Sequence, residues 1–187
     1  MRKLIAGFAT SIDGFIEGPN GEIDWIILDK EQFKELAEYW KKIDAMFHGR
    51  KTYEAALAMQ KGSNLPAGRQ GKKQANPFAH MKHYVFSNTL KKVEEGYILV
   101  SGDLKKEVNK IKNEPGKEIA VFGGGLLVCS LLNLGLVDEL SLAICPVLLG
   151  KGRPFFPDIT KRINFTVKEV KSYTSGLVSL TYAVKKK

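Results

Sequence analysis

Apolar and polar positions follow two different rhythms along the chain. Short continuous apolar runs, typical of buried strands, occupy residues 4–9, 45–48, 83–87, 96–101 and 118–122. Between these runs the pattern is helical, at residues 29–43, 52–59, 104–112 and 126–134. Strands that alternate with helices are typical of an α/β protein, so this is the fold class that the pattern predicts.

The last third of the chain follows a different pattern. Residues 139–149, 165–172 and 177–184 are predicted strands, and no helical segment separates them. Consecutive strands without a crossover helix pair in the antiparallel sense. The sequence therefore predicts a mixed sheet, in which antiparallel strands complete an α/β body.

One polar segment interrupts this pattern. Gly, Pro, Lys, Gln, Asn and Ser dominate residues 62–79, which is typical of a long mobile loop rather than of a domain boundary. The length of 187 residues is that of one domain with its own core. We expect a single domain over residues 1–187, with the loop as an insertion.

The formal net charge of +9 favours anionic partners. The Lys and Arg residues are scattered, and no stripe of cations is interleaved with aromatic residues. The charge therefore does not indicate nucleic acid as a partner. A phosphorylated small molecule fits the positive net charge better. We identify no metal-ligand motif in the sequence.

Two features of the sequence concern the compartment. No apolar run approaches the roughly 20 residues that cross a bilayer, and the apolar run near Met1 is too short for the core of a signal peptide. Cys129 and Cys145 both have apolar neighbours, as is typical of buried free thiols in a reducing environment. We therefore expect no membrane association and a cytoplasmic location.

Three successive glycines mark one candidate binding site. Gly123, Gly124 and Gly125 stand where a predicted strand ends and an apolar helix begins. Free backbone N–H groups and the helix dipole suit a pyrophosphate there, and missing side chains allow it a close approach. A tight turn packed against a neighbour is the structural alternative. Three glycines exceed what such a turn needs, which favours phosphate contact.

A second candidate site lies where another strand meets a helix. Arg50 and Lys51 at the helix start form an anion site, and Thr52 can cap the helix or bond a phosphate oxygen. Two adjacent cations suit the 2′-phosphate that distinguishes NADPH from NADH. A solvated helix start is the alternative. For His48 we prefer a histidine bonded to backbone over a catalytic one.

A third candidate site is the segment after the first strand. Glycines and a Pro-Asn-Gly turn signal predict a loop over residues 11–25. Ligands bind at strand ends in open α/β sheets, so this loop is a candidate for substrate contact. Asp13 and Asp24 either cap turns or serve the function, and the sequence does not choose.

These segments, in this order and spacing, resemble the dihydrofolate reductase superfamily, and in particular its branch similar to the reductase domain of the bifunctional riboflavin-biosynthesis deaminase-reductase. The matching segments are residues 11–16, 49–54, 85–88, 122–125, 138–140 and 146–156. The resemblance implies a dihydrofolate-reductase-like three-layer fold. Its central sheet is mixed and mostly parallel, with helices on both faces and an antiparallel C-terminal hairpin.

The resemblance also implies NADPH as the cofactor. The residues that would contact it are Ala9, Ile16, Arg50, Lys51, Thr52, Ser87, Asn88, Gly123, Gly124, Gly125, Leu126 and Leu127. The cations and Thr52 would hold the adenosine phosphate and the pyrophosphate, and Ser87 and Asn88 would flank the adenine ribose. Ala9 and Ile16 would touch the nicotinamide.

The implied reaction is hydride transfer to a C=N carbon of a pyrimidine or pteridine heterocycle, similar to that of 5-amino-6-(5-phosphoribosylamino)uracil reductase. Asp24 and Trp25 are the candidates for substrate binding. Asp13 or Asp29, or a water that one of them holds, is the candidate proton donor. Dihydrofolate reductases place an acid five residues after the loop tryptophan, where this chain has Lys30. Dihydrofolate reduction is therefore the alternative interpretation.

Other interpretations remain open. The chain could bind NADPH without efficient turnover, or be a flavin-dependent reductase. The riboflavin-type relatives pair through their late strands, so the resemblance implies a homodimer. The apolar stretch at residues 140–149 agrees with this, although a buried monomer core explains it equally well.

Overall fold

The computed structural model describes residues 1–27, 29–60, 78, 80–122 and 124–185. Most of the loop that we predict at residues 62–79, and Gly123 of the glycine turn, lie outside the described residues. All statements below concern the described part of the chain.

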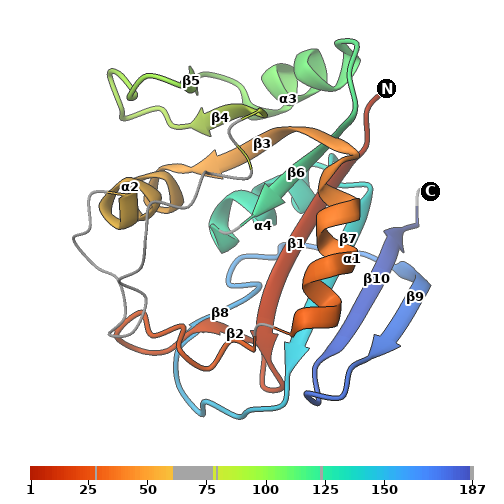
Figure 1. The fold of residues 1–187 in the computed structure, drawn as a ribbon. Helices are drawn as coiled ribbons and strands as arrows, with labels where there is room; N and C mark the ends of the chain where they lie inside the picture. Colours follow the sequence, from red (N-terminus) through yellow and green to blue (C-terminus); the bar gives the residue numbers. More distant parts are fainter. Residues whose placement is uncertain (28, 61–77, 79, 123, 186–187) are drawn as a thin grey trace.

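The central sheet has eight strands in the order β5-β4-β3-β6-β1-β7-β10-β9 (Figure 1). These strands are β1 (Leu4–Ser11), β3 (Ile43–Gly49), β4 (Lys82–Phe86), β5 (Tyr97–Val100), β6 (Glu118–Phe122), β7 (Glu139–Cys145), β9 (Phe165–Ser172) and β10 (Val178–Val184). Neighbours from β5 to β7 run parallel, whereas β10 is antiparallel to both β7 and β9. The predicted mixed, mostly parallel sheet with an antiparallel C-terminal hairpin is confirmed.

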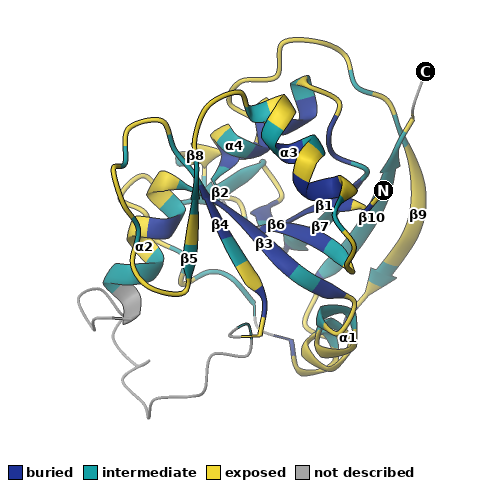
Figure 2. Cartoon of the chain, turned by 90° about the horizontal axis from the view of Figure 1, so that it is seen from above, coloured by how far each residue is buried: buried dark blue, intermediate teal, exposed yellow. Residues whose placement is uncertain are grey.

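Helices cover both faces of this sheet. They are α1 (Lys30–Trp40), α2 (Arg50–Gln60), α3 (Leu104–Asn113) and α4 (Gly125–Asn133). Seen from above, α3 and α4 lie on one side of the sheet and α1 lies on the other (Figure 2). The three layers of the predicted fold are therefore present. None of the described helices combines the length and the apolar character that crossing a bilayer requires.

The core lies between the parallel strands and the helices that cover them. Leu4, Phe47 and Val121 come from three adjacent strands, and all three are fully buried. Val128 and Leu131 of α4 belong to the same cluster and are equally buried. Strand β1 is buried along most of its length because both of its faces are covered, whereas the edge strand β9 is mostly exposed.

One predicted strand is shorter than its pattern indicates. Strand β7 ends at Cys145, so the strand prediction was wrong for residues 146–149. Pro146 has no N–H group with which to continue the ladder. The Val147 N–H donates to the Cys145 carbonyl at 2.8 Å, which closes a tight turn.

A second, two-stranded sheet was not predicted. It pairs β2 (Phe15–Glu17), within the expected loop, with β8 (Arg153–Pro154). The two strands approach so closely that a Cβ atom on Gly152 would overlap the Glu17 carbonyl oxygen. Strands this short contain no period that a sequence pattern can reveal.

A buried lysine joins three elements of the fold. The Lys112 ammonium at the end of α3 donates to the Leu136 carbonyl at 2.7 Å and to Asp138 Oδ2 at 2.6 Å. The Leu4 N–H of β1 donates to the same Asp138 oxygen at 2.9 Å. Because the Lys112 side chain is only 2% exposed, this ion pair is shielded from water and its geometry is fixed by packing.

We expect Lys112→Ala to lower the free energy of unfolding by about 3–5 kcal/mol, because it leaves the Asp138 carboxylate without its buried cation. Lys110→Ala on the exposed side of the same helix is the control, and it should change stability by less than about 0.5 kcal/mol. Urea denaturation of the two variants measures the difference. Equal losses would show that the bridge contributes nothing specific.

Candidate functional site

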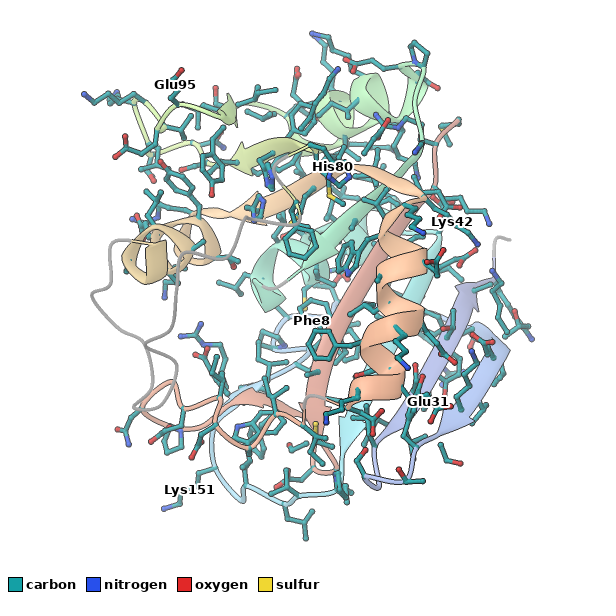
Figure 3. All side chains as sticks on the ribbon, viewed as in Figure 1. Phe8, Glu31, Lys42, His80, Glu95 and Lys151 are labelled. Carbon is teal, nitrogen blue, oxygen red and sulfur yellow. The ribbon has the colours of Figure 1, made fainter. Side chains whose placement is uncertain are left out.

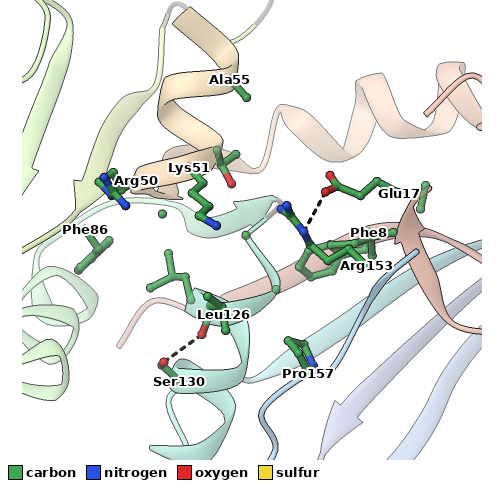
Figure 4. A pocket seen from close by; sticks show the side chains of 18 of the residues that line it. Phe8, Glu17, Arg50, Lys51, Ala55, Phe86, Leu126, Ser130, Arg153 and Pro157 are labelled. Carbon is green, nitrogen blue, oxygen red and sulfur yellow. Dashed lines mark hydrogen bonds and ion pairs between the residues drawn. The ribbon is translucent and has the colours of Figure 1, made fainter. Parts of the chain in front are cut away.

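The largest concentration of predicted site residues surrounds a cavity of about 610 Å³ at the carboxyl ends of β1 and β3 (Figure 4). Those that line it are Ala9, Ile16, Arg50, Lys51, Thr52, Gly124, Gly125, Leu126 and Leu127. Helices α2 and α4 follow β3 and β6, which are neighbours in the sheet. Two helix N-termini therefore meet at one side of the cavity.

The glycine turn determines how closely these two helix starts approach. Gly124 has φ +75° and ψ 71°, a left-handed conformation that favours glycine. A Cβ atom there would lie 3.0 Å from Thr52 Oγ1 and 3.8 Å from the Gly49 nitrogen. Among the described residues no side chain caps α4, so its first N–H groups face the cavity side without a side-chain acceptor.

The start of α2 supplies positive charge to the same place. Arg50 forms an ion pair with Glu54 one turn later, at 3.6 Å, and both side chains are 47% exposed. The Lys51 ammonium points into the cavity (Figure 4). A cation at a helix N-terminus opposes the helix dipole, so this arrangement is favourable only when an anion sits between the charges.

Another part of the cavity lining is formed by apolar side chains. They include Phe8 and Ala9 of β1, Ile16 of β2 and Ile26. The Phe8 ring meets the Phe155 ring edge-on, with their centroids 4.4 Å apart. The cations and helix starts of the lining therefore suit an anion, and its apolar side chains suit a flat heterocyclic ring.

Two charged residues of the cavity were missed by the sequence analysis. Arg153 Nε lies 2.9 Å from Glu17 Oε1, across the small β2–β8 sheet. Both residues line the cavity. Arg153 falls within the matching segment 146–156, and Glu17 directly follows Ile16, but their pairing required the structure.

Ser87 and Asn88 line a separate hollow next to the cavity. Phe86 and Leu127 line both the hollow and the cavity. Ser87 Oγ accepts from the Leu90 N–H at 3.1 Å, and Asn88 Oδ1 accepts from the Gly102 N–H at 2.7 Å. Both side chains therefore shape the turns that form this hollow.

Asp13 does not line the cavity. Its carboxylate accepts from Ser11 Oγ at 2.6 Å and from the Gly150 N–H at 2.7 Å, and it also accepts from the Leu149 N–H. The hydrogen bond from Ser11, followed by those from the two backbone groups, lowers the pKa of this carboxyl. In the structure Asp13 is a charged cap that joins two loops.

Asp29 also lies outside the cavity lining. It is the N-cap of α1, and its Oδ1 accepts from the backbone N–H groups of Glu31 and Gln32 at 2.9 and 3.1 Å. A hydrogen bond from Ser175 is the main cause that lowers the pKa of this carboxyl, and the Gln32 N–H adds to it. The carboxylate is therefore held in its charged form at a helix start.

Asp24 and Trp25 are likewise absent from the cavity lining. Asp24 is exposed, and Trp25 donates through Nε1 to the Glu22 carbonyl at 3.1 Å. The Trp25 ring packs against a cluster that includes Cys145 and Leu177. The structure brings Ile26, the next residue along the chain, to the cavity instead.

His48 has the environment of a structural histidine. It is buried, and its Nε2 lies 3.0 Å from Nδ1 of His83, whose other ring nitrogen lies 2.9 Å from the Phe78 carbonyl. Burial, with a smaller contribution from His83, lowers the pKa of His48 to about 4. The residue is therefore neutral at physiological pH, and it does not line the cavity.

The chain is similar to known proteins along almost its whole length. The family model described as the RibD C-terminal domain matches residues 2–179. The uncharacterized protein YyaP of Bacillus subtilis is 37% identical over 184 residues, which covers 97% of this chain and 94% of that protein.

Solved structures show the same fold. A Shewanella sp. PV-4 protein assigned to riboflavin biosynthesis has a TM-score of 0.73 and 26% identity, covering 98% of this chain and 99% of its own. The Thermotoga maritima diaminohydroxyphosphoribosylaminopyrimidine deaminase/5-amino-6-(5-phosphoribosylamino)uracil reductase has a TM-score of 0.67 and 17% identity, covering 98% of this chain and 57% of its own.

The fold also extends to dihydrofolate reductase. The Enterococcus faecalis enzyme, in its complex with NADP(H), has a TM-score of 0.60 and 19% identity, covering 98% of this chain and 97% of its own. The resemblance indicated by the sequence motifs is thus confirmed across almost the whole chain. The chain belongs to the RibD C-terminal domain family, and it has the dihydrofolate-reductase-like fold.

Proposed function

We propose that this protein is an NADPH-dependent reductase that transfers hydride to a pyrimidine or pteridine heterocycle, similar to 5-amino-6-(5-phosphoribosylamino)uracil reductase. The observation that carries the proposal is the mixed lining of one cavity. Two helix N-termini, Lys51 and Arg50 line part of it, and apolar side chains line another part. A dinucleotide with a charged pyrophosphate and a flat nicotinamide ring matches both parts.

The residues present fit this cofactor. A side chain at Gly124 would fill the space beside Thr52 that a pyrophosphate needs for contact with the start of α4. Arg50 and Lys51 would hold the 2′-phosphate and the pyrophosphate, and Thr52 would bond a phosphate oxygen. The neighbouring hollow at Ser87 and Asn88 would take the adenine ribose. When bound, the cofactor supplies the hydride.

The apolar side chains of the lining would align the reacting rings. Phe8, Ala9 and Ile16 exclude water there and limit the positions that a flat ring can take. Because Asp13 and Asp29 do not line the cavity, we propose that either one acts through a water molecule that delivers the proton. Asp24 and Trp25 stay candidates for the substrate side, next to Ile26, which does line the cavity.

The environment of Asp29 favours a substrate other than dihydrofolate. Lys30, the first residue of α1, stands where the resemblance places the acid of folate enzymes. A shift of one residue does not supply the acid, since the Asp29 carboxylate already accepts the N–H groups of Glu31 and Gln32. A phosphorylated pyrimidine or a small pterin agrees better with the positive net charge of the chain.

We also propose a homodimer in the cytoplasm. Val167 and Val170 of β9 are each 59% exposed, and they pair with Tyr182 and Leu180 of β10. Cross-strand partners share a face, so an apolar face remains that a second copy would cover. Two buried free thiols agree with a reducing compartment. A monomer in light scattering at micromolar concentration would contradict the dimer.

We expect the native protein to bind NADPH about tenfold or more tightly than NADH, because a charge-assisted contact to the 2′-phosphate contributes about 1.5–3 kcal/mol. Replacing Arg50 and Lys51 together by Ala should remove most of this preference. The matched control replaces Lys41 and Lys42, two exposed adjacent cations away from the cavity, and should keep it. Equal affinities for both cofactors in the native protein would refute the assignment.

Gly124→Val should abolish NADPH binding in a protein that still folds. The new side chain would press on Thr52 and occupy the approach to α4, and a β-branched residue resists the left-handed conformation. Gly135→Val is the control, because Gly135 also has positive φ, at +68°, but a Cβ atom there would have no neighbouring atom within 4 Å. Calorimetric titration of both variants, after circular dichroism, makes the comparison. Unchanged NADPH affinity in folded Gly124→Val would rule out the glycine turn as the pyrophosphate site.

The function itself is tested by the oxidation of NADPH in the presence of each candidate substrate. We expect turnover with the phosphorylated ribosylaminopyrimidine or a small pterin, and with dihydrofolate a rate about 10²–10⁴-fold lower, as for enzymes that lack a positioned acid. Robust dihydrofolate turnover that is lost in Asp29→Asn would favour dihydrofolate reductase. Tight NADPH binding without NADPH oxidation in the presence of any candidate substrate would favour the alternative that the protein binds NADPH without efficient turnover.

A further inference from the structure

Arg153 approaches the cavity from the side opposite α2. In Figure 4 the nitrogen-bearing ends of Lys51 and Arg153 point toward the same central space from two different walls. Lys51 comes from the start of α2, and Arg153 comes from β8, on the far side of the glycine turn. An anion between them would contact cations from both sides.

The packing of β8 places Arg153 beside the start of α4. A Cβ atom on Gly125 would lie 3.1 Å from the Phe155 carbonyl oxygen and 3.7 Å from that of Pro154. The chain directly after Arg153 therefore rests against the first turn of α4. This is the helix whose uncapped N–H groups we assign to the pyrophosphate.

Glu17 holds the Arg153 guanidinium by one edge only. The ion pair joins Nε of Arg153 to Oε1 of Glu17 at 2.9 Å. Within the described part of the chain, the two terminal amino groups of this guanidinium form no other ion pair. The Arg153 side chain is 49% exposed, so these groups can reach a bound anion.

The charges that line the cavity indicate that Arg153 binds an anion. Arg50, Lys51 and Arg153 line the cavity, whereas Glu17 is the one carboxylate among its described lining residues. Arg50 and Arg153 each pair with a glutamate, whereas Lys51 forms no ion pair with another described residue. A pyrophosphate carries two negative charges, so Lys51 alone does not neutralise it, and a second cation beside α4 would.

Resting on the proposed function, we propose that Arg153 is a cofactor-binding residue. It contacts the pyrophosphate of the bound nicotinamide dinucleotide from the β8 side. Glu17 is its positioning residue, since it fixes the guanidinium through Nε and leaves the two amino groups for the phosphate oxygens. The pair therefore affects NADPH and NADH alike, whereas replacing Arg50 and Lys51 also removes the preference for NADPH.

The test uses three probes: NADPH, NADH and adenosine 2′-monophosphate, which lacks a pyrophosphate. Arg153→Met should lower the affinity for both dinucleotides by the same factor of about ten or more, and should leave the affinity for the monophosphate unchanged. Lys151→Met is the matched control, because Lys151 is an exposed cation two residues away that points outward (Figure 3). It should change none of the three affinities, which calorimetric titration measures without turnover.

Glu17 is tested by a pair of substitutions. Glu17→Ala should weaken both dinucleotides, because the guanidinium loses its anchor, and Glu17→Gln should restore most of the affinity, because its amide oxygen still accepts from Nε. Glu17→Ala that binds both dinucleotides as the native protein does would overturn the positioning role. Unchanged monophosphate affinity in each variant verifies that the rest of the site is intact.

Three outcomes would overturn the proposal for Arg153, and they differ from one another. Native dinucleotide affinity in Arg153→Met would show that Arg153 makes no contact with the cofactor. A raised KM for the heterocyclic substrate at unchanged cofactor affinity would assign Arg153 to the substrate instead. A native protein that binds neither dinucleotide would refute the proposed function as well.

Discussion

The candidate site depends on how closely the starts of α2 and α4 can approach. Strands β3 and β6 are neighbours, so the helices that follow them begin side by side, and Gly124 packs against Thr52 and Gly49. A side chain at this point would separate the two helix starts. Their dipoles then would not act on one place, and the uncapped N–H groups of α4 would be covered. One missing Cβ atom thus makes a candidate anion site out of two ordinary strand-to-helix connections.

Two of the three cations that line this site are held in ion pairs before any ligand arrives. Arg50 pairs with Glu54 and Arg153 pairs with Glu17, so their side chains keep defined positions despite being about half exposed. Exposed pairs of this kind contribute little to stability, of the order of 0–1 kcal/mol each. Their value lies in orientation, because an arginine held by one edge offers its remaining donors to a phosphate in a fixed plane. The net charge of +9 attracts anions in general, and we propose that the pairs decide where one binds.

Periodicity in the sequence predicted most of the fold, because long buried strands and amphipathic helices repeat over many residues. The glycine turn and the Arg50–Lys51 pair could be recognised locally, since each site consists of adjacent residues. The Glu17–Arg153 pair could not, because it joins residues far apart in sequence through two very short strands. The resemblance identified Asp13 and Asp29 as candidates, but it could not predict their hydrogen-bond partners. Those partners make Asp13 a loop cap and Asp29 a helix cap.

The protonation state of Asp13 and Asp29 limits which group can donate the proton in the proposed reaction. Hydrogen bonds lower the pKa of both Asp13 and Asp29, so both are ionised near neutral pH and neither carries a proton to donate. His48 is neutral and buried, so it does not serve as the acid either. Hydride addition to a C=N carbon must place a proton on the nitrogen. With these three groups excluded as direct donors, we propose that the proton comes from water. A substrate whose nitrogen is basic enough to take a proton from water therefore suits this cavity better than one that needs a strong acid beside it.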